Sequence, residues 1–460
     1  MKHYDAIVIG SGQAGTPLSK KLAQSGLKTA LIEQRWVGGT CVNDGCSPTK
    51  AMVASAKAAW SVGHNKKLGV VSEKTTIDFK TILKRKNDIV QSMRKNVEKG
   101  INETANLDLY YGSASFSAEK EITIALNDGK PLVLSADQFF INTGLKPRIP
   151  EIEGIDNIEY LTSTSIMELS EIPEHLLILG SGYIGLEFGQ MFRRFGSKVT
   201  ILEASERILK KEDKDIAEEV ANILKEERIE MLTGSKAVKV EKTGNHIVAN
   251  IESGDKKTTI ECSHMLVATG RAPQTDALNL KVTGVETDEK GFIKANDKLE
   301  TTAKDIYVLG DVKGGPAFTH ISFDDYRILE ENIIRKGKAT ITNRLVPYCM
   351  FIDPQLGRVG ITEQEAKKQG LDFKVATLKN DSVARSIETG DERGLMKVIV
   401  DAKSKKILGA AVLAEQGGEI AAILQMAMMG GITYDKIRDG VFAHPTYAES
   451  LNNLFMTLDE

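Results

Sequence analysis

The feature that most constrains this chain is a glycine-rich turn that occurs twice in the same surroundings. The first copy has an apolar strand, a turn of the form Gly-x-Gly-x-x-Gly, a helix, and a second strand followed by an acid. In order, these parts are residues 5–9, the glycines Gly10, Gly12 and Gly15, residues 17–24, residues 28–32, and Glu33. A glycine turn alone is weak evidence, but one with strand, helix and acid in place is typical of a dinucleotide-binding βαβ unit.

The second copy repeats every part of the first at a constant offset of 170 residues. It consists of the strand 175–179, the glycines Gly180, Gly182 and Gly185, the strand 198–202, and Glu203. The alternative is two unrelated glycine turns in ordinary α/β units. Because strand, turn, helix and acid agree twice in one chain, we favour two dinucleotide sites.

The physical role of each position explains the spacing. The first glycine makes a tight turn, the second lets the backbone approach a pyrophosphate, and the third lets the helix pack on the strand. The helix N-terminus offers free N–H groups and a positive dipole end to the phosphates. The acid accepts the ribose hydroxyls, and Glu203 would repel a 2′-phosphate, which favours NADH. Arg207 lies close enough in sequence to leave NADPH open.

The rest of the chain predicts an α/β protein with two Rossmann-like domains and a C-terminal α+β domain. At 460 residues the chain is too long for one ordinary core. Apolar strands over 138–143 and 264–269 lead into Gly144 and Gly270, and a strand over 301–311 ends at Asp311. A ligand role is favoured for Asp311, with a cap or turn role as the alternative. The predicted domains are 1–145 (first dinucleotide-binding domain, first part), 146–270 (second dinucleotide-binding domain), 271–342 (return of the first domain) and 343–460 (C-terminal domain).

Smaller elements fill the space between these segments. We expect an amphipathic helix over 78–105 and hairpins over 231–261. Strands are expected at 346–352, 396–400 and 407–414, followed by a methionine-rich helix over 419–429.

Composition excludes some classes of partner. The chain is 41% hydrophobic and 27% charged with a formal net charge of -3, which gives no reason to expect nucleic acid or a membrane surface as partner. The most apolar run, 420–429, is interrupted by Gln425 and is too short to span a bilayer. No targeting segment precedes the first strand, so we expect a cytoplasmic protein, in which four cysteines are not structural disulfides.

The most informative segment contains two cysteines five residues apart. Cys41 and Cys46 flank a turn at Gly45, and Pro48 suits the first turn of a helix. Cys46 would start that helix, whose dipole stabilises a thiolate that can donate to a flavin, while Cys41 exchanges with substrate. The alternatives are half of a zinc site, an inert thiol pair and a plain glycine-rich turn. The position after the first ribose acid argues against all three.

Late in the chain, His444 and Glu449 form a second reactive pair. Histidine titrates near neutrality and can take a proton from the Cys41 thiol or protonate a leaving thiolate. Glu449, five residues on, can orient the imidazole. The alternative for His444 is a structural histidine, and the Pro-Thr-x-x-Glu that follows favours catalysis.

With both fingerprints, the Gly-Gly-Thr-Cys-x4-Cys segment and His444-Pro-Thr-x-x-Glu449, the chain resembles the pyridine nucleotide-disulfide oxidoreductases. The resemblance covers essentially the whole chain. It implies FAD and NADH as cofactors and a homodimer in which His444 reaches the other subunit's Cys41. It also implies that Lys50 pairs with Glu187 near the flavin and that Tyr183 covers the flavin until nucleotide enters. Further FAD contacts are implied for Thr40, Lys50, Thr143, Gly144 and Asp311, and a nucleotide contact for Gly270.

Within that family the chain is most similar to the mercuric-reductase-like branch. Gln13-Ala14, Ser47-Pro48-Thr49-Lys50 and the segment 385–389 carry this similarity. It implies Cu(II) or Hg(II) as acceptor, met by the two thiols as substrate and not as a resident metal. Residues 456–460 lack the tail cysteines of true mercuric reductases, so mercury detoxification is not expected.

Three alternatives to this branch remain. Lipoamide dehydrogenase is the first, although it usually has a second histidine where this chain has Phe442. Glutathione reductase is disfavoured because its nucleotide site usually carries arginines. A non-catalytic flavin-binding redox sensor is the alternative from another class.

Overall fold

The computed structural model describes residues 1–72 and 75–459. The described chain divides into two compact units, each built from segments far apart in sequence. Unit 1 contains Met1–Ala51, Leu83–Arg148 and Gly270–Arg344, and unit 2 contains Met52–Ile82, Ile149–Thr269 and Leu345–Glu460.

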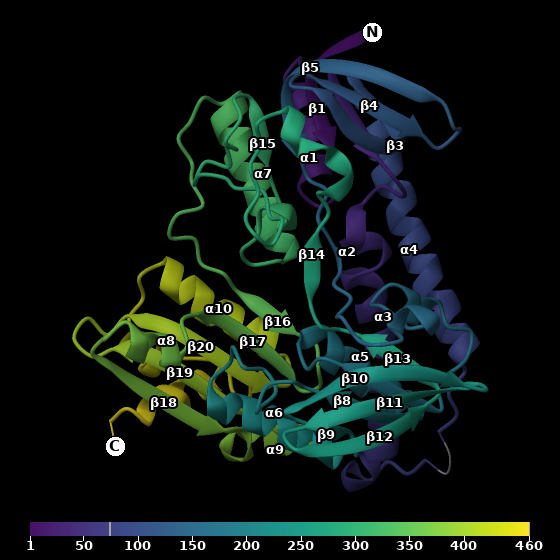
Figure 1. The fold of residues 1–460 in the computed structure, drawn as a ribbon. Coiled ribbons are helices and arrows are strands. Elements are labelled where there is room, and N and C mark those ends of the chain that lie inside the picture. The colour runs from purple at the N-terminus through teal and green to yellow at the C-terminus, as the bar shows by residue number, and fades with distance from the viewer. Residues whose placement is uncertain (73–74, 460) are drawn as a thin grey trace. The chain divides into compact units, whose positions relative to one another are not determined.

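Unit 1 is built around a parallel sheet with the strand order β3-β2-β1-β5-β15, coloured from purple to green in Figure 1. β4 belongs to the same six-stranded sheet and pairs antiparallel with the far halves of β3 and β5. Every residue of β2 is buried, as expected for a parallel strand covered on both faces. The strands are β1 (Lys2–Ile9), β2 (Thr29–Glu33), β3 (Leu107–Ala118), β4 (Glu121–Leu126), β5 (Pro131–Ile141) and β15 (Ile306–Val308).

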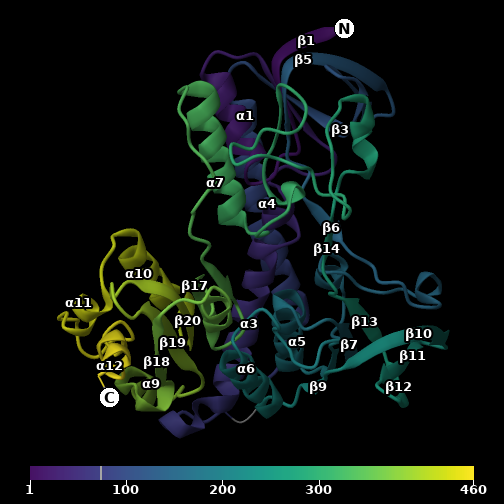
Figure 2. The same ribbon diagram turned by 60° about the vertical axis from the view of Figure 1, so that its left-hand side comes forward.

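Helices cover this sheet because their apolar residues recur on one face. Leu18 and Leu22 of α1 pack with Leu329 of α7 in a single apolar cluster, and the two helices lie side by side (Figure 2). The helices of the unit are α1 (Gly15–Gln24), α2 (Gly39–Asn43), α7 (Thr319–Leu329) and the larger part of α4 (Phe79–Asn102). Shorter elements are β6 (Leu145–Pro147), β14 (Arg271–Pro273), η4 (Asp276–Leu278), η5 (Leu280–Val282), η6 (Asp311–Lys313) and η7 (Glu330–Ile334).

Unit 2 begins with a smaller copy of the same architecture. A four-stranded parallel sheet with the order β13-β7-β8-β9 is followed by an antiparallel meander, β10-β11-β12. These elements are β7 (His175–Leu179), α5 (Tyr183–Phe195), β8 (Lys198–Leu202), α6 (Lys214–Glu226), β9 (Glu230–Leu232), β10 (Ser235–Thr243), β11 (His246–Ser253), β12 (Lys256–Cys262) and β13 (His264–Val267). Short turns precede them at η2 (Ile155–Asn157) and η3 (Ser165–Glu168), and α3 (Cys46–His64) with η1 (Asn65–Leu68) ends in this unit.

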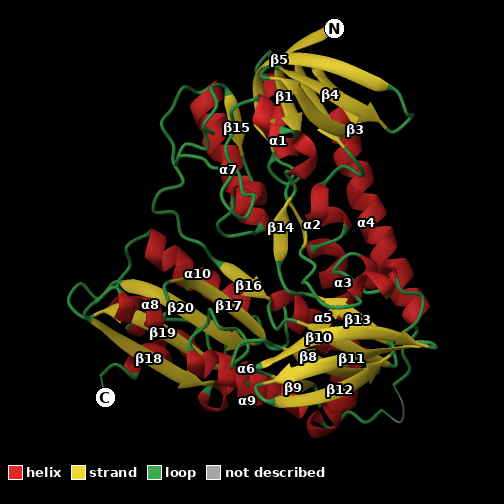
Figure 3. Ribbon diagram, viewed as in Figure 1, coloured by secondary structure: helices red, strands yellow, loops and turns green. Residues whose placement is uncertain are grey.

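The C-terminal part of unit 2 is a five-stranded antiparallel sheet with helices, seen as yellow strands and red helices in Figure 3. Its strand order is β16-β17-β20-β19-β18, and its core is formed by buried aliphatic side chains of β19, β20 and α10. The elements are β16 (Tyr348–Met350), β17 (Gln355–Gly360), α8 (Glu363–Lys368), β18 (Phe373–Lys379), η8 (Asn380–Ser382), α9 (Ala384–Thr389), β19 (Leu395–Asp401), β20 (Ile407–Ala414), α10 (Gly417–Met429), α11 (Tyr434–Arg438) and α12 (Ser450–Met456).

The predicted fold class, two dinucleotide-binding α/β folds and a C-terminal α+β part, is therefore confirmed. One detail is wrong: the strand expected over 301–311 covers only Ile306–Val308. Asp311 begins the short helix η6 beyond it, because Gly310, with φ of 76°, turns the backbone out of the sheet.

Candidate active site

The first glycine turn and its acid form a closed hydrogen-bonded cradle in unit 1. Glu33 Oε2 accepts hydrogen bonds from the backbone N–H of Ser11 at 3.1 Å and from its hydroxyl at 2.7 Å. Glu33 Oε1 accepts from the N–H of Arg35 at 2.8 Å. Gly10 has a φ of 102°, which a residue with a side chain rarely adopts. The carboxylate is thereby fixed at the carboxyl end of β2.

The second cradle repeats this geometry atom for atom. Glu203 accepts from the N–H and the hydroxyl of Ser181 at 3.1 and 2.6 Å and from the N–H of Ser205 at 2.8 Å. Gly180 has a φ of 103°. Although burial raises the pKa of Glu203, the hydrogen bonds from Ser181 and Ser205 outweigh it and hold that pKa below its usual value. Glu203 is therefore ionised at neutral pH.

The first cradle fits FAD because its backbone surfaces come too close to allow side chains. A Cβ built on Gly39, which has a φ of 63°, would lie 2.6 Å from the Cα of Gly12. A Cβ on Gly12 would lie 2.9 Å from Asn142 Oδ1, the atom that accepts a hydrogen bond from the N–H of Gly15. Such bare backbone is what a pyrophosphate at a helix N-terminus requires.

This close approach predicts that Gly39→Ala loses bound flavin. The added methyl must displace the Gly12 backbone, so we expect the purified variant to keep about a tenth or less of the wild-type FAD content. The ratio of flavin to protein absorbance measures the loss. Gly244→Ala is the matched control, since Gly244 has a φ of 61° and its Cβ would contact none of the described residues within 4 Å. If both variants lost flavin equally, backbone strain alone would explain the loss, and the close approach of Gly39 to Gly12 would not be its cause.

Buried polar groups line the carboxyl end of the unit 1 sheet. Burial raises the pKa of Asp311, and the positive charge of Arg271 opposes this shift. Arg271 Nε is buried and, among the described residues, has no hydrogen-bond partner. The Thr143 hydroxyl donates to the carbonyl of Gln274 at 2.7 Å. An unpaired buried donor beside an acid fits a polar cofactor edge.

The two cysteines lie on two successive helices. Cys41 is in α2, an element that the sequence did not predict, and Cys46 is the first residue of α3 as expected. Both are thiols, Cys41 half-buried and Cys46 exposed. A hydrogen bond with Cys46, together with burial, raises the pKa of Cys41. The raised pKa disfavours a thiolate at Cys41.

Thr319 completes the surroundings of the cysteine pair. Its hydroxyl oxygen lies 3.3 Å from Cys46 Sγ, and Thr319 is the first residue of α7. Two helix N-termini thus meet at this sulfur, and both favour negative charge there.

The remaining predicted residues fall into the two units as follows. Lys50 is on α3 in unit 1, whereas Glu187 is on α5 in unit 2. Glu187 is 3% exposed and accepts a hydrogen bond from the N–H of Phe351 at 2.8 Å.

The other predicted cofactor contacts are described by their backbone and exposure. Thr40 is an exposed residue of α2, and Tyr183, which is 40% exposed, is the first residue of α5. Gly144 and Gly270 have positive φ values of 69° and 120°. Gly182 precedes α5, and a Cβ on Gly185 would lie 2.1 Å from the carbonyl oxygen of Gly180.

In unit 2 the predicted histidine and glutamate are in direct contact. His444 Nδ1 lies 2.8 Å from Glu449 Oε2 and 3.1 Å from Oε1. The His444 side chain is 68% exposed and that of Glu449 30%. The contact orients the imidazole and leaves Nε2 facing away from the carboxylate.

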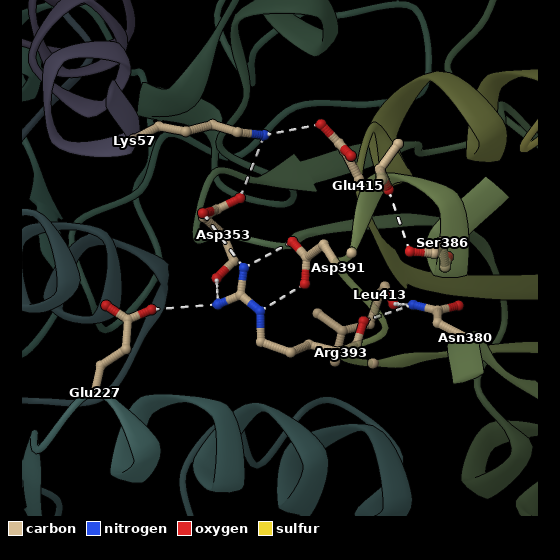
Figure 4. A network of polar contacts seen from close by, with 12 residues as sticks. Lys57, Glu227, Asp353, Asn380, Ser386, Asp391, Arg393, Leu413 and Glu415 are labelled. Atoms are coloured by element: carbon tan, nitrogen blue, oxygen red, sulfur yellow. Dashed lines mark hydrogen bonds and ion pairs between the residues drawn. The ribbon is translucent and has the colours of Figure 1, made fainter. Parts of the chain in front are cut away.

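The loop that carries His444 contacts a network of charged side chains. Figure 4 shows the part of this network that includes Lys57, Asp353, Arg393 and Glu415. Tyr447 donates its hydroxyl proton to Glu415, which also pairs with Lys57 at 3.4 Å. Lys57 lies 3.4 Å from Asp353, and Asp353 in turn pairs with Arg393.

The buried end of this network is formed by Arg194, Asp353 and Glu227. The Arg194 guanidinium contacts Asp353 at 2.8 Å and Glu227 at 2.6 Å, and all three side chains are less than 10% exposed. Buried pairs of this geometry fix orientation more than they add stability.

Sequence reasoning missed two residues of the site. Asn142 ties the first glycine turn to β15, because its amide also donates to the carbonyl of Leu309 at 2.8 Å. Thr319 reaches Cys46 from 273 residues away. Asn142 lies within the segment 138–143 that was expected as a strand leading into Gly144, and this position is the signal that the sequence offers for it. No sequence pattern marks Thr319.

Two kinds of feature are not found among residues 1–72 and 75–459. No helix in these ranges has the length and apolar character needed to cross a bilayer. The same ranges contain no group of three or more His, Cys, Asp or Glu side chains placed to hold a metal ion.

Known proteins resemble this chain over its full length. Relatives include the probable pyridine nucleotide-disulfide oxidoreductase RclA of Escherichia coli, 38% identical over 99% of both chains. A mercuric reductase of Staphylococcus aureus is 36% identical over 99% of this chain and 83% of its own. A dihydrolipoyl dehydrogenase of Thermus scotoductus is 34% identical over 98% of this chain and 96% of its own.

Solved structures and family models agree with these relatives. The Cu(II) complex of the HOCl-induced flavoprotein disulfide reductase RclA from Escherichia coli superimposes with a TM-score of 0.91 at 37% identity, covering 99% of each chain. The model of the pyridine nucleotide-disulphide oxidoreductases matches residues 4–325, and that of their dimerisation domain matches 346–455. The chain therefore belongs to the pyridine nucleotide-disulphide oxidoreductase family, as an enzyme that uses FAD and a nicotinamide nucleotide.

Proposed function

We propose that the protein passes electrons from NADH through FAD to the Cys41–Cys46 disulfide and from there to Cu(II). The observation that carries this proposal is the arrangement at Cys46, whose sulfur lies at the start of α3 and 3.3 Å from the Thr319 hydroxyl. FAD, when bound, supplies the two-electron relay between the nicotinamide and the cysteine pair. The cradle of Gly12, Gly39 and Glu33 would hold it.

The protein's own groups manage the sulfur chemistry. The Sγ–Sγ bond breaks when it accepts the two electrons and one proton that oxidation of NADH supplies. Cys41 takes up the proton as a thiol, and the Thr319 hydroxyl and the α3 dipole stabilise the negative charge on Cys46. The reduced pair then gives two electrons to two Cu(II) ions, which become Cu(I), the Sγ–Sγ bond reforms, and the single proton of Cys41 leaves. His444 accepts the proton of Cys41, oriented by Glu449.

The remaining site roles are part of the same proposal. We assign Lys50 and Glu187 as an ion pair near the flavin and Tyr183 as the residue that covers it before nucleotide binds. Thr40, Thr143, Gly144 and Asp311 are assigned to FAD, and Gly270 to the nucleotide. The domain boundaries remain those proposed from the sequence.

A homodimer is part of the proposal because the chain has a dimerisation domain and His444 is exposed at 68%. In such a dimer His444 of the partner subunit serves Cys41. The proposed place of action is the cytoplasm, where thiols are kept reduced.

NADH is the proposed nucleotide because the second cradle carries an anion. The ionised Glu203 accepts ribose hydroxyls but repels a 2′-phosphate. Arg207, the group that could have reversed this preference, donates to the carbonyl oxygens of Lys210 at 3.1 Å and Glu212 at 2.9 Å. Because its guanidinium is engaged in its own loop, it offers little compensation to a 2′-phosphate. Since the pKa of Glu203 is lowered, the preference should persist down to about pH 5.

Cu(II) is favoured over other acceptors by one relative. RclA, which matches this chain end to end, has been solved as a Cu(II) complex. Hg(II) is an acceptor of the same soft-ligand chemistry, supported by the mercuric reductases among the relatives. Lipoamide reduction is the second candidate, supported by the dihydrolipoyl dehydrogenase match.

The test is NADH and NADPH oxidation by the purified flavoprotein with Cu(II), Hg(II), lipoamide and glutathione disulfide in turn. We expect kcat/KM to be about tenfold or more higher with Cu(II) than with either disulfide, and higher with NADH than with NADPH. Chelation of Cu(I) by a colorimetric reagent confirms that the metal is reduced. If turnover is faster with lipoamide than with Cu(II), lipoamide replaces Cu(II) as the proposed acceptor, and the cofactor assignment is unaffected.

A further inference from the structure

Two of the four residues between the two cysteines, Asn43 and Asp44, form polar contacts with residues outside the redox pair. Asn43, which is 8% exposed, donates its amide to the carbonyls of Val37 at 2.9 Å and Gly39 at 3.0 Å. Its Oδ1 accepts a hydrogen bond from Arg94 Nε at 2.8 Å. Arg94 comes from α4, so a distant helix holds the middle of the segment.

The next residue of the segment is attached in the same manner. The Asp44 carboxylate, whose side chain is 12% exposed, forms an ion pair with the guanidinium of Arg35. Arg35 follows β2 and its N–H also donates to Glu33 at 2.8 Å. The segment is thus linked to the end of the strand that carries the ribose acid.

Both arginines contact one aromatic ring. The Cζ atoms of Arg35 and Arg94 lie 4.6 and 4.1 Å from the ring centroid of Trp36. The carbonyl of Trp36 also accepts a hydrogen bond from the amide of Asn43 at 3.3 Å. Arg35, Trp36 and Arg94 form the unit that we call the Trp36 clamp. Cation–π contacts restrict both guanidinium groups, and through them Asn43 and Asp44.

We propose that the Trp36 clamp consists of positioning residues that hold the segment 42–45 ready for disulfide closure and thereby set the redox potential of Cys41–Cys46. This inference rests on the proposed function of the two cysteines. Closing a disulfide requires the intervening residues to give up backbone freedom. A segment already fixed in the dithiol has less freedom to lose, so its two thiols have a higher effective concentration toward each other.

The clamp also neutralises a charge next to the reactive sulfur. Asp44 lies two residues before Cys46, and an unpaired carboxylate there would oppose the thiolate. The ion pair with Arg35 removes this effect. Where loss of the clamp leaves Asp44 unpaired, the pH at which the dithiol reacts should therefore shift upward.

The experiment measures the redox equilibrium of the cysteine pair in the FAD-loaded protein without any acceptor. The protein is equilibrated with mixtures of oxidised and reduced dithiothreitol, the thiols are alkylated, and the peptide containing Cys41 and Cys46 is quantified by mass spectrometry. In this exchange the pair loses two electrons and two protons as its Sγ–Sγ bond forms, and the cyclic disulfide of dithiothreitol gains them. We expect Trp36→Ala to lower the effective concentration about tenfold, which raises the potential by about 30 mV.

Three further variants test the mechanism. Trp36→Phe keeps an aromatic ring and should restore the equilibrium to within about threefold of wild type. Asp44→Asn is close to isosteric and tests the clamp even if Trp36→Ala folds poorly; about a threefold decrease is expected. Lys84→Gln, which removes an exposed cation of the same helix α4, is the control and should leave the equilibrium unchanged.

The inference is overturned if both Trp36→Ala and Asp44→Asn stay within about twofold of wild type, or if either tightens the disulfide. Failure of the proposed function would look different. In that case the wild-type pair itself would not interconvert reversibly between dithiol and disulfide. A failure of the Cu(II) assignment alone would not affect this measurement, because no acceptor is present.

Discussion

The Cys46→Ser variant is expected to lose NADH-driven reduction of every acceptor by about 10³-fold or more while it keeps its flavin. Serine cannot form the disulfide, so two-electron storage at the Cys41–Cys46 pair disappears. The first half of the reaction, bleaching of the flavin by NADH, should remain. Stopped-flow absorbance of the flavin and steady-state NADH oxidation with Cu(II) measure the two halves separately.

The control for this variant is another cysteine of the same chain. Cys262 is 1% exposed in β12, and its thiol lies 3.6 Å from the carbonyl oxygen of Ile247. Cys262→Ser replaces a thiol by a hydroxyl in a site without proposed chemistry and should keep wild-type turnover. If Cys46→Ser also kept it, electrons would pass from flavin to acceptor without the thiols, and the disulfide mechanism would be wrong.

The second large effect is expected at His444. His444→Gln should lower kcat with a disulfide acceptor about 10²- to 10⁴-fold, the usual contribution of a positioned acid–base group. The loss should appear only in the reoxidation of the thiols, since the histidine is not proposed to act in reduction by NADH. Rapid mixing of pre-reduced enzyme with acceptor isolates that step.

The contact between His444 and Glu449 gives this prediction a second check. Glu449→Gln removes the charge that orients the imidazole and should lower the same rate by about tenfold or more. Added to His444→Gln it should have little further effect, because residues that act as a unit are not additive. His246→Gln is the control, since His246 is also paired with a glutamate, Glu261, at 3.7 Å in unit 2. Additive losses in the double variant would contradict a joint role.

The strands with strong local signals could be predicted from the sequence, several of them to the residue. Residues 175–179, 198–202 and 407–414 match β7, β8 and β20. Their apolar runs are bounded by turns, so local pattern and final structure agree. The hairpins expected over 231–261 are likewise found as β10, β11 and β12.

Other elements depend on contacts that a linear reading does not contain. The meander of β3, β4 and β5 was not predicted, because β3 and β5 each change partners midway along their length. The helix α2 around Cys41 is only five residues long and depends on the positive φ values of Gly38 and Gly39. At the site, Thr319 and Arg94 reach the cysteine segment from other helices, and only the folded chain brings them there.

One of the differences between the two copies of the nucleotide cradle lies just after the strand that neighbours each glycine turn, and it bears on how long each cofactor remains bound. Asn142 follows β5 in the first copy, and Ala268 follows β13 in the second; each donates its N–H to the last residue of the neighbouring strand, at 2.8 Å. The Asn142 side chain accepts a hydrogen bond from the N–H of Gly15 and donates one to the carbonyl of Leu309. Ala268 has no side-chain amide that could form such bonds. A turn tied on two sides opens rarely, so its ligand leaves slowly. With the flavin in the first cradle and the nucleotide in the second, as proposed, we expect this asparagine to give the duplicated cradle two residence times. The flavin, which must survive many turnovers, would stay long, and the nucleotide, which must leave in each turnover, would stay briefly.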